Sequence, residues 1–193
     1  KNILSVTAID DQGQTTNSSI RVLRLMESTD INEAPQARRD IASLLTLGYM
    51  DVDQAQEFRP LEMMSRAAFA KALVAVRELP VRENGALPGD VDRRNEYAPA
   101  ISAVLAAGYL TTTTEGLFKP TAYIQRQDAV MAIVKMDGLD TGAVDTKKLF
   151  TDIEPYMPFA PYVAAAVKAG IVQAGEQVNP EQEITKEEAA RLL

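Results

Sequence analysis

Apolar residues recur three and four positions apart in three segments of the chain, and each segment ends at a glycine. The segments cover about residues 37–47, 97–107 and 159–169, and the glycines are Gly48, Gly108 and Gly170. This spacing places the apolar side chains on one face of an α-helix. A glycine after the last turn is free to take the left-handed conformation that ends a helix. The pattern therefore predicts three amphipathic helices with a similar stop signal.

A second helical segment follows each glycine, after a loop that contains a proline. The loop from Phe58 to Arg66 (FRPLEMMSR) recurs sixty positions later from Phe118 (FKPTAYIQR), and again from Val178 (VNPEQEITK). Ser65 is a good N-cap for a helix over 66–77, and Thr185 forms a capping box with Glu188. Similar patterns predict helices over 126–136 and from residue 186 onward. Constant spacing of this kind indicates internal repeats, here three helix-loop-helix units over 30–77, 90–137 and 150–193. Their buried faces should include Phe69/Leu73, Val130/Ile133 and Ala189/Leu192.

The first 25 residues follow a different pattern. Polar and apolar residues alternate over Ile3–Ile9 and over Ile20–Leu25, with a turn sequence at 10–14 between them. Alternation with period two on both sides of a turn predicts a β-hairpin. A single hairpin is marginally stable in water, so we expect it to be the end of a β-sandwich whose other strands precede residue 1. The chain would then be a fragment.

The remaining segments are connectors. Residues 26–37 are expected to form a polar connector into the first repeat, and residues 78–89 and 138–146 to link the repeats, because prolines and glycines interrupt the helical pattern there. The predicted fold class is thus mainly α, with three repeats and an N-terminal hairpin.

Composition narrows the chemistry. The chain contains no cysteine, so it has no disulfide and no thiolate metal site. It also contains no histidine, which is the commonest general base and the commonest zinc ligand. A net charge of −7 argues against a general nucleic-acid binder. No apolar run is long enough to cross a bilayer, so membrane insertion is not expected. Asp51 and Asp53 suggest a calcium loop, but the glycine and terminal glutamate of such a loop are misplaced. No carboxylate pair has a hydrolase pattern, so we predict neither an enzyme nor a cofactor or metal.

Three copies with these glycine and proline positions resemble S-layer homology domains. The consensus of that family runs roughly F-x-D-V, W-A, a helix ending in G, then F-x-P and I-T-R-A-E. The third copy is nearest to it, from Phe150-Thr151-Asp152-Ile153 to Ile184-Thr185-Lys186-Glu187-Glu188. The hairpin resembles the last strands of bacterial immunoglobulin-like domains. The resemblance implies a three-pronged pseudo-trimer with one helix of each repeat in a central bundle. It also implies a non-catalytic anchor at the bacterial cell surface, which holds an anionic secondary cell-wall polymer, often pyruvylated, between the prongs.

The resemblance also implies which residues contact that polymer. The arginine of T-R-A-E corresponds to Arg66, Arg126 and Lys186, and the acidic positions are Asp30, Asp90 and Asp152, while Tyr97 and Phe159 replace the usual tryptophan. A cation at a helix start lies beside N–H groups that favour anions. Arginine can bind a carboxylate through two contacts and lysine through one. Residues 150–193 also carry a net charge of −4 (three cations, seven carboxylates). We therefore expect Arg66 and Arg126 to dominate polymer binding.

Each of these positions also has a structural interpretation. The cations could be paired with neighbouring carboxylates, the aspartates could cap helices or form turns, and the two aromatic residues could pack in the core at the helix entry. At the level of the whole chain, the alternative to glycan binding is a protein–protein module that packs against neighbouring surface-protein subunits.

Overall fold

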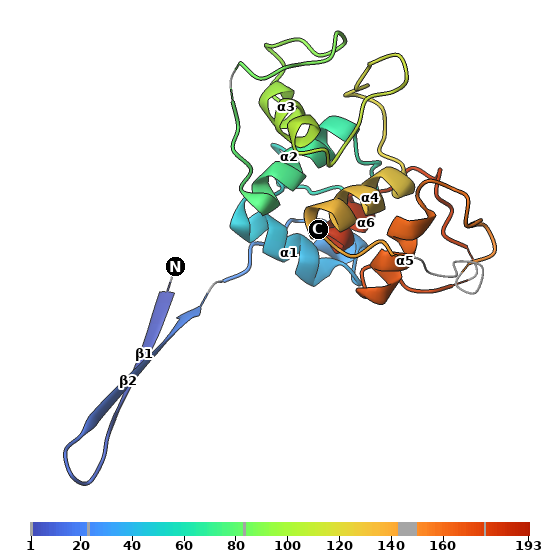
Figure 1. Ribbon diagram of the computed structural model, residues 1–193. Helices are drawn as coiled ribbons and strands as arrows, with labels where there is room; N and C mark the ends of the chain where they lie inside the picture. The colour runs from blue at the N-terminus through green and yellow to red at the C-terminus, as the bar shows by residue number, and fades with distance from the viewer. Residues whose placement is uncertain (1, 23, 83, 143–149, 176) are drawn as a thin grey trace.

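The computed structural model describes residues 2–22, 24–82, 84–142, 150–175 and 177–193, and of residues 2–4 and 20–22 it describes the backbone alone. It consists of a two-stranded hairpin and a helical body (Figure 1). Residues 143–149 lie outside the described residues, and they include residues 143–146 of the predicted linker. The elements are β1 (Asn2–Ile9), β2 (Thr15–Val22), the 3-10 helix η1 (Ile31–Glu33), α1 (Arg38–Leu47), α2 (Arg66–Arg77), α3 (Ala98–Ala106), α4 (Arg126–Met136), α5 (Ala160–Lys168) and α6 (Lys186–Leu192).

The helices begin and end at the predicted signals. Gly48 is left-handed with φ of 74°, and the corresponding glycines 108 and 170 have φ of 73° and 76°. A side chain would be strained at these angles, so glycine is what lets the chain leave the helix here. The Ser65 hydroxyl accepts a hydrogen bond from the backbone N–H of Ala68, and Thr185 and Glu188 form the complete capping box. The predicted helix boundaries are thus confirmed by local chemistry.

A ring of backbone hydrogen bonds, which we call the central ring, joins the three repeats. Met64 donates to the carbonyl of Ile184 (2.9 Å), Ile184 to that of Ile124 (3.1 Å), and Ile124 to that of Met64 (2.9 Å). Each of these residues comes two positions before the second helix of its repeat. Because every repeat donates to one neighbour and accepts from the other, the arrangement has a pseudo-three-fold axis. This confirms the predicted arrangement of the repeats.

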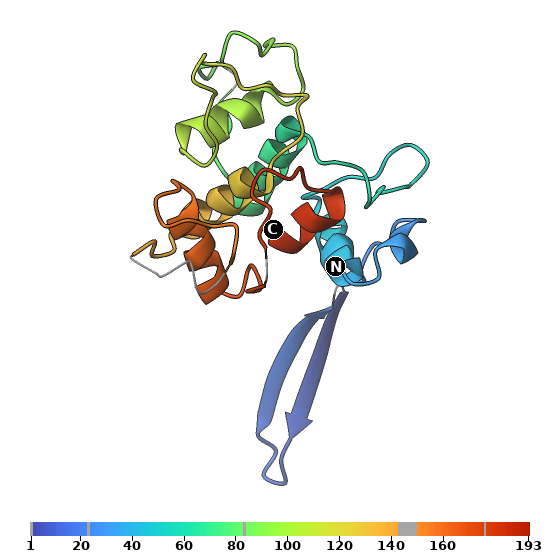
Figure 2. The same cartoon turned by 90° about the vertical axis from the view of Figure 1, so that its right-hand side faces the viewer.

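The helices continue the same cyclic order. The second helix of each repeat packs against the first helix of the next one, α2 against α3, α4 against α5, and α6 against α1 (Figures 1 and 2). The predicted apolar faces point inward: Phe69, Leu73, Val130, Ile133 and Ala189 are buried, while Leu192 is partly buried. No repeat therefore completes its core alone.

The connector before α1 differs from the prediction. Residues 26–37 were expected to be a polar connector, but Ile31, Ala34 and Ala37 are buried in the core. The short helix η1 turns these three small or apolar side chains inward, while the polar residues between them face solvent. This segment is structurally a part of the first repeat.

The hairpin is confirmed, although its second strand begins and ends earlier than expected. Thr15 pairs with Ile9 directly after the turn, and β2 ends at Val22. The turn explains the early start, because the Asp10 carboxylate accepts from the backbone N–H groups of Gln12 and Gln14 and holds the two strands together at once. All described side chains of residues 5–19 are exposed. The hairpin projects away from the helical body beside α1 (Figure 2).

Candidate ligand-binding grooves between the repeats

Each repeat uses its aspartate to hold the loop that precedes its second helix. The Asp30 carboxylate accepts from the backbone N–H groups of Phe58 (3.0 Å) and Arg59 (2.6 Å). Asp90 accepts in the same way from residues 118 and 119, and Asp152 from residues 178 and 179. Arg59 and its counterparts Lys119 and Asn179 all have positive φ, between 53° and 56°. The carboxylates thus stabilise a strained turn that is the same in all three repeats.

The hydrogen bonds of two of these aspartates also lower their pKa. Burial disfavours the charged form of Asp30 and Asp90, but the backbone N–H groups of the loop outweigh that effect, and the pKa of both carboxyls lies below its ordinary value of 3.8. Both carboxylates therefore stay ionised at neutral pH. Their oxygens are occupied by the protein's own loop.

The first cation, Arg66, crosses from repeat 1 into repeat 2. Its guanidinium donates to the carbonyls of Phe118 (2.9 Å) and Thr111 (2.8 Å) and to the carboxylate of Asp128 (2.7 Å). It also lies 4.9 Å from the centroid of the Phe118 ring. Only 12% of the Arg66 side chain is exposed. The Arg66 guanidinium is therefore engaged by groups of the protein itself, at the junction of repeats 1 and 2.

Arg126 makes the equivalent junction between repeats 2 and 3. Its guanidinium donates to the carbonyl of Val178 (2.7 Å), to the side chain of Gln182 (3.1 Å) and to Glu188 (2.7 Å). The second carboxylate oxygen of Glu188 accepts from the backbone N–H of Thr185 at 3.0 Å. Each oxygen of Glu188 therefore accepts one hydrogen bond from the protein.

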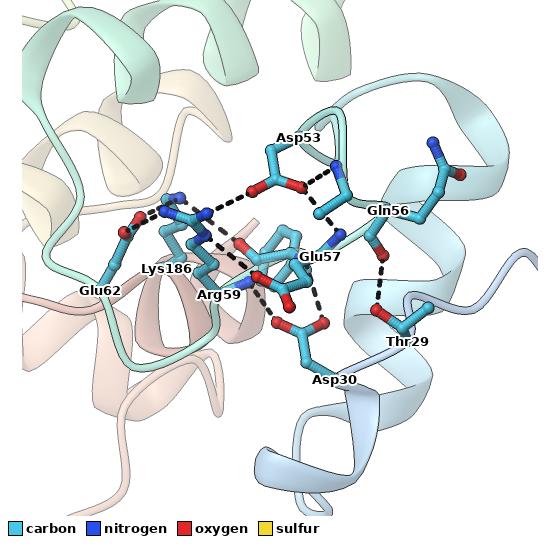
Figure 3. A network of polar contacts seen from close by, with 10 residues as sticks. Thr29, Asp30, Asp53, Gln56, Glu57, Arg59, Glu62 and Lys186 are labelled. Atoms are coloured by element: carbon cyan, nitrogen blue, oxygen red, sulfur yellow. Dashed lines mark hydrogen bonds and ion pairs between the residues drawn. The ribbon is translucent and has the colours of Figure 1, made fainter.

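Lys186 closes the cycle from repeat 3 to repeat 1, where its carboxylate partner belongs to the loop and not to the helix (Figure 3). Its ammonium donates to the carboxylate of Glu62 at 2.6 Å and, more distantly, to the carbonyl of Phe58 at 3.4 Å. Glu62 also pairs with Arg59 at 3.3 Å. The hydrogen bond from Lys186 is the main cause that lowers the pKa of Glu62, against the effect of burial, and Arg59 adds to it. The three predicted cations thus occupy equivalent places, and each one joins two repeats.

The two predicted aromatic residues lie at the entry of the first helices of repeats 2 and 3. Tyr97 and Phe159 directly precede α3 and α5, are partly buried and pack against the core. Tyr97 also lines a cavity that contains Lys186. The sequence did not predict that Tyr97 and Lys186 line the same cavity, because they belong to different repeats and only the arrangement of the repeats around the central ring brings them together.

Two cavities lie beside these cations, in equivalent positions of the pseudo-three-fold arrangement. The Arg126 groove has a volume of about 410 Å³ and is lined by Arg126, Glu188, Arg191, Gln173 and Gln36, with apolar residues between them. The Lys186 groove is smaller, about 150 Å³, and its lining includes Lys186, Lys71, Asp51, Ala68 and Tyr97. The Arg126 groove falls within the size range of small-molecule sites. Sequence reasoning did not single out Arg191 or Lys71, because neither belongs to the repeated loop motif.

Other features of the described residues do not provide a competing site. A cavity of about 740 Å³ lies between residues 79–88 and α3, but its lining is mostly apolar and contains none of the three cations. Within the described ranges, no group of three acidic residues is placed to hold a metal ion. None of the helices described is both long enough and apolar enough to cross a bilayer.

The repeats match a known family. The profile of the S-layer homology domain matches the chain three times, at residues 29–70, 90–130 and 149–190. These ranges contain the three cations, the three aspartates and both aromatic positions described above.

Similar proteins come from the surface layers of bacilli. The S-layer protein sap of Bacillus anthracis is 32% identical over 141 residues, which cover 70% of this chain. The surface-layer 125 kDa protein of Lysinibacillus sphaericus is 28% identical over 160 residues, or 80% of the chain. The S-layer protein of Bacillus thuringiensis subsp. finitimus is 30% identical over 142 residues, or 70% of the chain. The matched region spans only 17%, 13% and 17% of these relatives' own lengths.

Proposed function

The chain belongs to the S-layer homology domain family, whose general role is to anchor proteins to the cell wall, and we propose that it is a non-catalytic module that binds an anionic cell-wall polymer. It would act outside the cell, at the bacterial surface, and tether a larger surface protein. The hairpin would be the end of an immunoglobulin-like domain in that larger protein.

The observation that carries this proposal is the Arg126 groove. It is a cavity of about 410 Å³ between repeats 2 and 3, and two arginines, Arg126 and Arg191, line it together with the single carboxylate of Glu188. Its lining charges therefore sum to +1, although the whole chain carries −7. A local excess of positive charge at a cavity attracts an anionic ligand, and an arginine can bind a pyruvyl carboxylate through two hydrogen bonds. The amides of Gln36 and Gln173 supply partners for sugar hydroxyls.

The contacts of the predicted cations refine the expected contributions. Arg66 has no cavity of comparable size beside it among those described, and Lys186 borders a groove in which each cation has a carboxylate partner. Arg126 borders the larger cavity. That Arg66 and Arg126 contribute more than Lys186 stays a prediction. The geometry favours Arg126 within that pair.

Co-sedimentation with purified cell walls tests the proposal. The chain should sediment with intact walls and should remain in solution once the secondary polymer has been chemically removed. Retention by both preparations would contradict polymer binding. If the chain binds neither preparation but associates with itself or with other surface-layer subunits, the repeats act as a protein–protein module instead.

A further inference from the structure

The three repeats differ at one position of the second helix that lines the Arg126 and Lys186 grooves. Lys71 on α2 corresponds to Met131 on α4 and to Arg191 on α6, each sixty residues apart. In the Lys186 groove, the Lys71 ammonium is paired with the carboxylate of Asp51. Asp51 corresponds to Thr111 in repeat 2 and to Gln173 in repeat 3. Repeat 3 therefore keeps the cation and replaces its carboxylate partner with an uncharged amide.

Arg191 consequently has no ion pair within the part of the chain that the structure describes. It is exposed and it lines the Arg126 groove. Two carboxylates lie on the same helix within reach of an ion pair, Glu187 four residues earlier and Glu188 three residues earlier, but neither pairs with Arg191 in the described structure. Glu188 accepts instead from Arg126 and from the backbone N–H of Thr185, so Arg126 competes with Arg191 for that carboxylate.

From this arrangement we propose that Arg191 is the residue that binds the ligand's carboxylate, and that Arg126 is a positioning residue that keeps Arg191 unpaired. The inference rests on the proposed function and specifies its chemistry. The ligand presents a carboxylate to the Arg191 guanidinium, which can donate two hydrogen bonds to it. The sugar that carries the carboxylate lies against Ile171 and Val172, with Gln173 and Gln36 in reach of its hydroxyls.

The two grooves should differ in how strongly they bind a charged ligand. In the Lys186 groove the two cations are matched by Asp51 and Glu62, so an incoming carboxylate has to displace one that is already bound. In the Arg126 groove it meets Arg191 without such competition. Esterification of the ligand should therefore abolish most of its affinity, because only the charged form makes a charge-assisted contact with Arg191.

The experiment uses the full chain and a synthetic methyl hexoside that carries a pyruvyl ketal, with its methyl ester as the neutral control, and titration calorimetry as the measurement. Arg191→Met should weaken binding of the acid about tenfold or more. Lys71→Met, the same change in the Lys186 groove, should weaken binding much less than Arg191→Met, because Lys71 is already paired with Asp51. Gln173→Asp should also weaken binding, because it supplies Arg191 with the partner that Asp51 gives Lys71. The reciprocal Asp51→Gln should free Lys71 and add a second, weaker site.

The outcomes separate this inference from the proposed function. Unchanged affinity in both Arg191→Met and Gln173→Asp, with the chain still retained on intact walls, overturns the role of Arg191 and leaves polymer binding standing. The same holds if the acid and its ester bind equally. Absence of binding to both the hexoside and intact walls contradicts the proposed function itself. Circular dichroism of each variant, compared with the parent chain, establishes that a loss of affinity is not a loss of fold.

Discussion

Two of the three junctions between repeats reach the same backbone geometry with different side chains. At the junction of repeats 1 and 2, Arg66 is 12% exposed and pairs with Asp128, which belongs to a helix. At the junction of repeats 3 and 1, Lys186 is 27% exposed and pairs with Glu62, which belongs to a loop and is 48% exposed. The backbone hydrogen bonds of the central ring have the same pattern at both places.

The sequence shows how this difference arises. Repeat 1 has Ala68 where repeats 2 and 3 have Asp128 and Glu188, so its helix offers no carboxylate to Lys186. It has Glu62 instead, where the other repeats have an alanine and a glutamine at positions 122 and 182. The carboxylate has moved from the helix to the preceding loop. The comparison teaches that the junction requires a carboxylate near the cation, whereas the backbone ring does not require it at one fixed position.

The largest losses of stability should come from the rings beneath the two cations. Phe118→Ala removes a fully buried ring that also contacts Arg66, and it should lower the free energy of unfolding by about 3–5 kcal/mol. Phe58→Ala removes the equivalent ring, over which no cation is stacked in the described structure, and should cost about 0.5–1 kcal/mol less. Urea denaturation of both variants measures this. Equal losses would show that the stacked arginine adds nothing to the junction.

Removal of the cations themselves should give the next largest losses of stability. Arg66→Met leaves Asp128 and two carbonyls without their donor, and we expect a loss of about 2–3 kcal/mol. Lys186→Met breaks an exposed pair and should cost about 1 kcal/mol or less, an effect that weakens further at high salt. Thermal unfolding at low and high salt distinguishes the two. A larger loss for Lys186→Met would mean that the junction of repeats 3 and 1 is the stronger one.

Acid should weaken the loops of repeats 1 and 2 through their aspartates. The folded-state pKa of Asp30 and Asp90 is depressed, so their stabilising effect is complete above the ordinary value of 3.8 and is lost as the pH falls through the lower folded value. Asp90→Asn should reduce the slope of stability against pH in that acid range and cost about 1 kcal/mol at neutral pH. Denaturation series between pH 2 and 6 measure both. An unchanged slope would contradict the assigned role of the carboxylate.

The smallest effect is expected from the hairpin. Deletion of residues 1–24 removes strands whose described side chains are exposed, so the unfolding free energy of the helical body should change by less than about 1 kcal/mol. Differential scanning calorimetry of the shortened chain would detect a larger change. Such a change would show that the hairpin packs against the repeats in solution.

Local signals in the sequence were sufficient for the elements of each repeat. Gly48 and its counterparts, the Ser65 cap and the Thr185–Glu188 capping box are set by interactions within a few residues, so their pattern predicts the helix ends directly. The connector was misjudged because its inward residues, Ile31, Ala34 and Ala37, are separated by polar ones and belong to no regular helix.

The candidate site could be predicted only in part, because its contacts join repeats. Arg66 and Asp128 are 62 residues apart, and the sequence does not reveal whether a cation reaches toward the next repeat or the previous one. Once the structure shows that each cation reaches into the next repeat, the role of Glu62 becomes clear: it supplies the carboxylate that Ala68 cannot. The same holds for Arg191, whose lack of a partner depends on Gln173 in another segment of its repeat.

Under the proposed function, in which the chain tethers a larger protein, the central ring has a mechanical consequence. A pull applied through residues 24–28 enters at repeat 1, which is bonded on one side to repeat 2 through Met64 and Ile124 and on the other to repeat 3 through Met64 and Ile184. Repeat 1 cannot be peeled off one neighbour first, as it could in a linear array of repeats. Both junctions carry the load together, and the force needed to open the module should exceed what either junction withstands alone.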